Sequence, residues 1–384
     1  MERRPARHTA EARAFRLSLA IASSAVVVLG APFVGQLRGA ILARFPEYYR
    51  LIIGGIVLVS AATMVLIALT RIREHQRRRY AALGAAIGLG VGCELAFRTG
   101  NANVDVVEAF HFVEYGVITL LFYRVWRSNA DASAIVFPVL ASIVVGTADE
   151  WFQWFVPERA GEIRDVLLNG VAAVSGILFS VALDPPVPNV FPTRSGALAK
   201  LGAGVAVVLV LVAAFFSTVH LGYEVRDPEI GVFRARDTAA ELASAAHDRA
   251  ERWQARGPIG APRVSREDQY LSEGLWHVRR RNEAVENSDV VVAWRENRIL
   301  ERFYAPVIDA PSSTGVAGQR WPPEQRADIE AKSHGVVVSF ESDANPYPIY
   351  IWSKTVFWTL TVALSCGVFA LSVWADRRAR TTPT

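Results

Sequence analysis

Long apolar runs separated by short polar segments dominate the pattern of this chain. A helix needs roughly 20 mostly apolar residues to cross a bilayer, and we find segments that approach this length at eight places. They cover residues 17–35, 51–70, 80–97, 110–127, 134–155, 165–183, 200–220 and 353–375. Polar residues interrupt the third and fourth. The pattern predicts a mainly α-helical, polytopic transmembrane bundle of about eight spans.

The first apolar run follows a cluster of arginines, as the core of a signal peptide would. No series of small residues typical of a cleavage site follows it. Pro32 and Gln36 are expected to end its helix, because proline lacks the N–H donor that a helix interior needs. We therefore interpret this run as a retained membrane anchor.

Residues 221–352 have the mixed composition of a soluble domain. Thr238 and Glu241 form a capping box that opens a helix over 238–256, and a second helix is predicted over about 265–282. A short helix is expected to begin near Pro323. Runs of β-branched and aromatic residues predict strands, with a turn over residues 295–297; the strands cover 290–294, 299–304, 335–340 and 347–352. We expect a small α+β domain whose helices precede its sheet.

A proline-rich connector is typical of a stiff linker. This connector and the patterns above divide the chain into five regions. They are N-terminal transmembrane helices (1–104), a transmembrane core (105–183), the connector with one more helix (184–220), the α+β domain (221–352), and a C-terminal helix with a basic tail (353–384).

The composition supports the membrane class. The chain has 384 residues, 52% of them hydrophobic, and a mean hydropathy of +0.23, whereas soluble proteins of this size are rarely so apolar. Residues 222–350 hold 17 Lys and Arg against 21 Asp and Glu, a net charge of −4, so the rest of the chain carries +8. The basic excess therefore flanks the apolar runs and indicates contact with anionic lipid, with no role in binding nucleic acid.

The arginines also predict an orientation. Short basic loops stay on the cytoplasmic side, and arginines cluster at the N-terminus, at 71–79 and at 377–380. With eight spans all three clusters fall on that side, and the α+β domain is extracytoplasmic. We predict a multi-pass protein of the cytoplasmic (inner) membrane. Its only cysteines, Cys93 and Cys366, lie in apolar runs, so we expect no disulfide framework, no metal site and no cofactor.

Ionisable side chains interrupt the fourth predicted span. A charge at the centre of a spanning helix costs about 3 kcal/mol even on the insertion scale, so such residues need partners or a function. His111, Glu114 and Tyr115 stand three and four residues apart. They therefore share one face of the helix.

The next two spans carry a matching set of polar residues. Glu150 and Gln153 lie three residues apart near the end of the fifth span, and Asp165 and Asn169 lie four apart at the start of the sixth. Arg159 lies in the loop between them. Alternating helix directions bring all of these residues towards the outer half of the bilayer, which predicts a shared polar cluster.

These residues occur in ordered motifs: His111-Phe112-Val113-Glu114-Tyr115-Gly116, then Glu150-x-x-Gln153-x-Phe155-Val156-Pro157-x-Arg159, then Asp165-x-x-x-Asn169, then Gly176. Over residues 105–183 the chain resembles the VanZ-like family of membrane proteins, named for an accessory protein of glycopeptide resistance associated with teicoplanin. The resemblance implies a bacterial protein of the cell envelope with a possible effect on antibiotic resistance. It places the family signature on His111, Glu150, Gln153, Arg159, Asp165 and Asn169.

The chain departs from the family pattern at three places. Val107 and Glu108 stand where Asp-Lys is common, Glu158 replaces the usual Gly before the loop arginine, and Ala172 replaces a Gly after the asparagine. We interpret the first and third changes as packing substitutions. Glu158 makes the loop more acidic.

Two interpretations of the polar residues remain open. As interhelical glue they would contribute roughly 0.6 kcal/mol per hydrogen bond, with Glu150 paired to Arg159 and Asp165 to Arg164. As a binding site they would hold an amphiphile, because arginine grips phosphate and tryptophan favours the headgroup zone. Binding predicts that Arg159→Ala abolishes function without lowering membrane abundance.

Enzyme and transporter interpretations are weaker. Glu150 and Asp165 could act as an acid/base pair with His111 as proton carrier or metal ligand, but the sequence has no HExxH motif, nucleophile elbow or phosphate-binding glycine loop. A transporter would show paired repeats, and none is found. We predict binding of a lipid or lipid-linked cell-wall component, with a membrane-embedded enzyme acting on such a substrate as the alternative. The predicted ligand-binding residues are His111, Glu114, Tyr115, Glu150, Gln153, Arg159, Asp165 and Asn169.

Two further patterns have structural explanations. Gly84, Gly88 and Gly92 form a ridge of small residues that we expect to pack inside the bundle, with oligomerisation as the alternative. The basic, aromatic stretch 276–282 predicts a solvated helix face. Its alternative is a site for an anionic envelope polymer or a partner protein.

Overall fold

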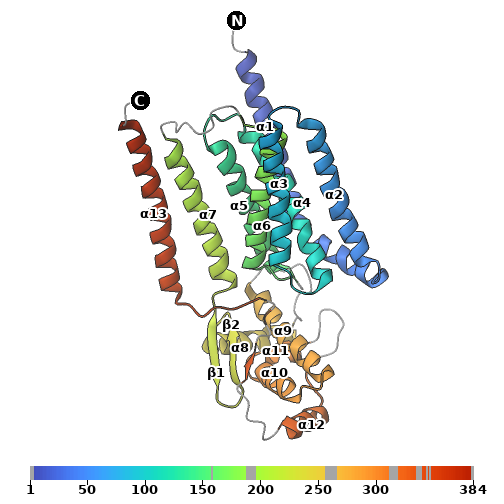
Figure 1. The fold of residues 1–384 in the computed structure, drawn as a ribbon. Coiled ribbons are helices and arrows are strands. Elements are labelled where there is room, and N and C mark those ends of the chain that lie inside the picture. Colours follow the sequence, from blue (N-terminus) through green and yellow to red (C-terminus); the bar gives the residue numbers. More distant parts are fainter. Residues whose placement is uncertain are drawn as a thin grey trace. The chain divides into compact units, whose positions relative to one another are not determined.

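The computed structural model describes residues 4–156, 159–186, 196–255, 266–310, 319–333, 340–342, 345 and 347–381. The chain forms two compact units (Figure 1). The membrane unit comprises Met1–Phe152, Ile163–Phe215 and Trp358–Thr384. The α+β unit comprises Gln153–Glu162 and Phe216–Phe357.

Long helices build the membrane unit. They are α1 (Arg4–Arg44), α2 (Tyr49–Arg71), α3 (Gln76–Ala96), α4 (Ala102–Trp126), α5 (Ser133–Phe155), α6 (Ile163–Leu183), α7 (Ala197–Val219) and α13 (Lys354–Thr381). Among the described residues, 7 helices, all of these except α3, are long and apolar enough to cross a membrane. Charges at both ends of α3 and its glycines lower its hydropathy. The expected mainly α-helical, polytopic bundle is confirmed.

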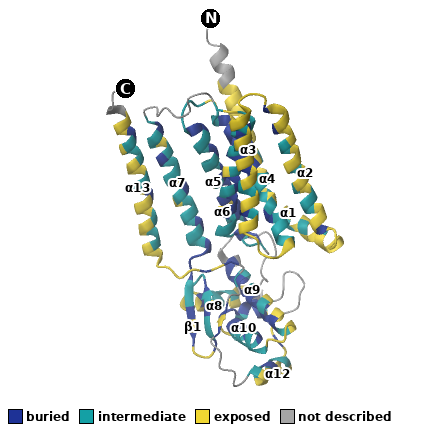
Figure 2. Cartoon of the chain, in the orientation of Figure 1, coloured by how far each residue is buried: buried dark blue, intermediate teal, exposed yellow. Residues whose placement is uncertain are grey.

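The outer faces of this unit are apolar. Much of α2 and α13 is exposed (Figure 2). Their exposed residues include Leu51, Leu58, Leu360 and Leu371. Exposed leucines in such numbers suit contact with acyl chains, because water does not drive their burial there.

Helix α1 is longer than the sequence indicates. Pro32 was expected to end it, yet the helix continues to Arg44 with Pro32 inside it. Proline is tolerated within apolar spanning helices because neighbouring groups satisfy the backbone bond it breaks. The predicted boundary at residue 35 is therefore wrong.

Helices α4 and α6 pack closely at Gly176. A Cβ atom at Gly176 would lie 2.9 Å from the Cα of Gly116 and 3.0 Å from the Cβ of Thr119. A methyl group there would meet backbone, which moves less readily than a side chain. Ala172 continues this contact, because it packs in one core cluster with Tyr115, Ile118 and Phe122 of α4.

The predicted glycine ridge does not pack inside the unit. Cβ atoms at Gly84, Gly88 and Gly92 would meet nothing within 4 Å among the described residues, and all three are exposed. The expectation of packing within the bundle is wrong, because other faces of α3, through Leu83, Ala86 and Cys93, are the buried ones.

These two kinds of glycine make a matched pair of variants. Gly176→Ala is expected to destabilise the detergent-solubilised protein by about 1–3 kcal/mol, the usual cost of overpacking. Gly88→Ala is expected to be neutral or stabilising, because alanine favours helix by about 1 kcal/mol. Thermal unfolding of both variants measures the difference. Equal midpoints would contradict the close contact of α4 with α6.

The α+β unit begins with a hairpin that the sequence analysis missed. Strands β1 (Tyr223–Asp227) and β2 (Gly231–Ala235) pair antiparallel, and β3 (Glu341–Ser342) pairs parallel to β2, in the order β1-β2-β3. Asp227 Oδ1 accepts hydrogen bonds from the backbone N–H groups of Glu229 and Ile230, at 3.0 and 3.1 Å. Gly231 supplies the positive φ of +115° that closes the turn.

Five helices complete the described part of this unit: α8 (Ala239–Ala255), α9 (Arg266–Glu286), α10 (Val290–Phe303), α11 (Ala305–Asp309) and α12 (Pro323–Ser333). The capping box of α8 is confirmed. Thr238 N–H donates to Glu241 Oε2 at 2.9 Å, and Glu241 N–H donates to Thr238 Oγ1 at 3.3 Å.

Several predicted strands are wrong. The strands at 290–294 and 299–304, and the turn between them, form the single helix α10, which Asp289 caps by accepting from Val292 N–H at 3.1 Å. Residues 347–352 make only an isolated bridge between Tyr350 and Leu221. Residues 335–339 lie outside the described residues. The expected order of helices before sheet is also wrong, because β1 and β2 come first.

Helix α9 buries a polar stripe. Glu273, His277 and Arg281 stand four residues apart and are all buried, so the predicted solvated face is wrong for His277 and Arg281. His277 Nδ1 lies 2.6 Å from Glu296 Oε2, and Arg281 Nη1 donates to Asn297 Oδ1 at 3.1 Å. Burial lowers the pKa of Arg281 to about 10.

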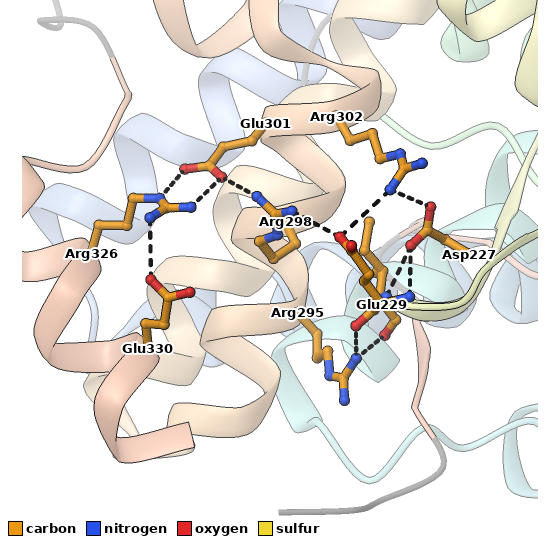
Figure 3. Close-up of polar contacts among 9 residues, drawn as sticks. Asp227, Glu229, Arg295, Arg298, Glu301, Arg302, Arg326 and Glu330 are labelled. Carbon is orange, nitrogen blue, oxygen red and sulfur yellow. Dashed lines mark hydrogen bonds and ion pairs between the residues drawn. The ribbon is translucent and has the colours of Figure 1, made fainter. Parts of the chain in front are cut away.

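Ion pairs tie the hairpin and α12 to α10 (Figure 3). Arg298 donates to Glu229 Oε2 at 3.2 Å and to Glu301 Oε2 at 3.0 Å. Arg326 contacts the other oxygen of Glu301 at 2.8 Å and Glu330 at 3.2 Å. Arg298 and Arg326 therefore face carboxylates.

Glu273 gives the α+β unit a pH dependence. Burial raises the pKa of its carboxyl above the usual 4.5, although the charge of Arg236 and a hydrogen bond from the Arg236 backbone oppose the shift. The folded state therefore binds this proton more tightly than the unfolded state, and stability falls as pH rises from about 4.5 through the raised pKa. Glu273→Gln is expected to reduce that fall in thermal unfolding experiments. Glu283→Gln, exposed on the same helix, is the control, and equal pH profiles for both variants would refute the role of Glu273.

Candidate functional site

Polar side chains of α4, α5 and α6 meet within the membrane unit. The first half of α4, the end of α5 and the start of α6 lie at the same end of the bundle, because α4 and α6 run opposite to α5 (Figure 1). Cross-helix contacts join them: His111 to Asn169, Tyr115 to Asp149, and Glu108 to Arg164. We call these six residues the polar centre.

His111 and Asn169 join α4 to α6. His111 Nδ1 lies 2.7 Å from Asn169 Oδ1, so the tautomer with hydrogen on Nδ1 donates this bond. Asn169 is completely buried, and its Nδ2 has no hydrogen-bond partner among the described residues. Gly146 makes room for it, since a Cβ there would lie 2.8 Å from Asn169 Cβ and 3.1 Å from Nδ2.

Tyr115 joins α4 to α5. Its hydroxyl donates to Asp149 Oδ2 at 3.0 Å, and its ring stacks on His111 with centroids 6.1 Å apart. One turn further on, Thr119 Oγ1 donates to Ser142 Oγ at 2.8 Å. The same face of α4 thus carries polar contacts to both neighbouring helices.

The remaining candidates of this unit lie close in sequence to these pairs. Glu150, next to Asp149, is completely buried. Glu114 and Asp165 are half-buried. A buried carboxylate without compensation is costly, and Glu150 takes part in further interactions that offset this cost.

An ion pair that the sequence analysis missed fixes the start of α6. Arg164 Nη1 and Nη2 lie 2.6 and 2.7 Å from the two carboxylate oxygens of Glu108, a bidentate contact. Nη2 also donates to the carbonyl of Phe97 at 2.7 Å. The expected partner, Asp165, lies at 3.8 Å from Nη1. Glu108 is therefore the main partner, and its position three residues before His111 was the signal that could have revealed it.

The other two candidates belong to the α+β unit. Arg159 Nη2 donates to Gln153 Oε1, an amide partner that the sequence analysis did not name. The adjacent Trp154 is buried; its Nε1 donates to Tyr347 Oη at 3.0 Å, and its carbonyl accepts from Gln269 Nε2 at 2.7 Å. The loop that carries part of the signature is thus held by this unit.

The described residues give limited scope for metal chemistry. No group of three or more His, Cys, Asp or Glu within them has the geometry of a metal site. What the polar centre offers chemically is hydrogen bonding: an amide donor, an imidazole and a carboxylate-bound guanidinium within two helical turns of α4.

Comparison with known proteins agrees with the motifs. Residues 56–184 match the family model described as VanZ/LLP1, which includes α3, α4, α5, α6 and most of α2. No curated protein and no solved structure matches this chain. The predicted VanZ-like resemblance is confirmed: residues 56–184 of this membrane protein are similar to the VanZ/LLP1 family.

Proposed function

We propose that the polar centre binds the headgroup of a lipid or of a lipid-linked cell-wall component. One observation supports this most: buried polar side chains of three apolar helices meet at one end of the bundle and leave the Asn169 Nδ2 donor without a partner among the described residues. An unsatisfied buried donor costs about 1–3 kcal/mol. A headgroup rich in oxygen acceptors would compensate this cost.

Interhelical glue explains the paired atoms but not this donor. Each of the three pairs joins two helices, as glue requires. A hydrophobic residue at 169 with a smaller partner at 111 would join α4 to α6 without burying an unsatisfied amide. The ligand proposal accounts for the same pairs as a scaffold that holds Asn169 in place.

The proposal includes a location. The protein lies in the cytoplasmic membrane of a bacterium, and α3 crosses it together with the 7 more apolar helices. Both termini are then cytoplasmic and the α+β unit is extracytoplasmic, as the distribution of arginines predicts. The polar centre then faces the outer leaflet, where lipid-linked cell-wall components and glycopeptides meet. An effect on glycopeptide susceptibility would follow from sequestering or presenting such a component.

Native mass spectrometry of the purified protein tests the proposal. Asn169→Asp keeps an oxygen for His111 Nδ1 and replaces the open donor with an acceptor, so we expect it to lose the lipid that the wild type retains. Asn129→Asp, in the turn after α4 where Asn129 donates to Ser133, makes the same chemical change elsewhere and is expected to retain it. Equal lipid retention by both variants would refute the proposal.

A further inference from the structure

Trp154 anchors the loop between α5 and α6 in the α+β unit. Its indole is buried and its Nε1 donates to Tyr347 Oη at 3.0 Å. Its carbonyl accepts from Gln269 at 2.7 Å, and its ring meets Phe155 edge-on with centroids 4.8 Å apart. Two hydrogen bonds of Trp154 therefore attach this segment to the rest of the unit.

Two arginines contact this anchored segment. Arg159 Nη2 donates to Gln153 Oε1. The guanidinium carbon of Arg236 lies 4.3 Å from the centre of the Trp154 ring. The two guanidinium groups thus contact consecutive residues. Arg159 belongs to the family signature, and Arg236 lies in the segment that follows β2.

Both arginines keep donors without acceptors. Arg159 Nε, and Arg236 Nε and Nη1, are buried and have no hydrogen-bond partner among the described residues. Unsatisfied charged donors in the interior cost more than neutral ones. Arg298 and Arg326, in contrast, direct their guanidinium groups at carboxylates (Figure 3).

The carboxylate of Glu273 accepts from other groups. Glu273 Oε1 accepts from the backbone N–H of Arg236 at 3.1 Å, and Oε2 accepts from the Tyr304 hydroxyl at 3.2 Å. Both oxygens of Glu273 therefore already accept from groups other than the Arg159 and Arg236 guanidiniums. An oxyanion with several acceptor atoms is the kind of ligand that would satisfy the remaining N–H groups.

We propose that Arg159 and Arg236 form a phosphoryl-binding site beside Trp154. Guanidinium donors match phosphate oxygens in geometry and charge, and the indole holds Arg236 in position through the cation–π contact. If the ligand is a phosphorylated lipid headgroup, this inference deepens the proposed function and rests on it. A soluble phosphate ester is the other source of the same chemistry.

The test uses the full chain and two probes. Inorganic pyrophosphate, titrated calorimetrically into the detergent-solubilised protein, reports a soluble source. Retention of phosphatidic acid from nanodiscs of neutral glycolipid, read by native mass spectrometry, reports a lipid source. Loss of one charged hydrogen-bond donor is expected to weaken binding about 10- to 100-fold, so Arg159→Gln and Arg236→Gln should each show that loss with at least one probe.

Matched variants distinguish a loss specific to this site from a general effect of removing an arginine. Arg279→Gln also removes an arginine stacked on a tryptophan, 4.2 Å from the Trp276 ring, but at an exposed position, and it should bind as the wild type does. Arg236→Lys keeps the charge and loses the forked donors, so it should also bind more weakly, and it serves if Arg236→Gln fails to fold. The combined Arg159→Gln and Arg236→Gln variant should lose less than the product of the single losses, because both grip one group.

Three results would overturn the inference: no binding of either probe to the wild type, unchanged binding by Arg236→Gln and Arg236→Lys, or an equal loss in Arg279→Gln. Lipid retention by Asn169→Asp, measured in the same preparations, reports the membrane unit separately. If Asn169→Asp retains lipid as the wild type does while the Arg159 and Arg236 variants still lose binding, the proposed function is refuted. The phosphoryl site would then remain as a site for a soluble ligand.

Discussion

Arg164→Ala is expected to lower the stability of the protein in detergent by about 3–5 kcal/mol, the usual effect of breaking a buried ion pair from one side. The variant would leave Glu108, which is only 8% exposed, without its bidentate partner. It would also free the Phe97 carbonyl. Thermal unfolding and membrane abundance measure the loss.

Two controls separate this pair from surface electrostatics. Lys332→Ala removes an exposed partner of Asp328 within α12, and such pairs contribute about 0.3–0.5 kcal/mol. Replacing both members of the buried pair, as Glu108→Leu with Arg164→Met, is expected to recover most of the loss, because no charge remains uncompensated. A double variant less stable than Arg164→Ala would contradict the pairing.

Trp154→Ala is expected to destabilise the α+β unit by about 3–5 kcal/mol, as buried tryptophans usually do when truncated. The change would remove the donor to Tyr347 and the ring beneath Arg236. Limited proteolysis should then cut near residues 153–162 faster than in the wild type. Trp352→Ala, at a position 59% exposed, is the control, and equal cleavage rates in both variants would show that Trp154 does not anchor the loop.

The sequence predicted the membrane unit well because hydropathy and length set its helices directly. Pro32 did not end α1, since apolar surroundings tolerate proline inside a helix. The glycine ridge of α3 faced outward, because spacing identifies a helix face without telling which neighbour covers it.

The α+β unit was predicted less well because capping and packing oppose the strand propensity of some of its residues. The run Val290, Val291, Val292 favours a strand by propensity, yet Asp289 caps a helix there. That helix buries Ala293 and Leu300 on one face. The missed hairpin did carry a signal: Asp227 and Gly231 bracket a turn between alternating residues.

For the candidate site, spacing found the right helix faces but not the partners. His111 with Asn169 was within reach, since both positions carry the family signature. The pair of Tyr115 with Asp149 depends on helix rotation, which a single sequence does not encode in its periodicity. Glu108, by contrast, lies one turn before His111 and could have been added to the predicted face. The contribution of Arg236 was out of reach because it comes from more than 70 residues beyond Arg159 along the chain.

Ligand-induced stabilisation tests the central claim, that the polar centre is a headgroup site, most directly. The measurement is the thermal unfolding midpoint of delipidated protein, with and without a polar lipid extract of the host membrane. A ligand present at 100 times its Kd stabilises by about 2.7 kcal/mol, so the wild type and Asn129→Asp should gain stability while Asn169→Asp should not. An equal gain in all three proteins, or no gain in any, would contradict the account.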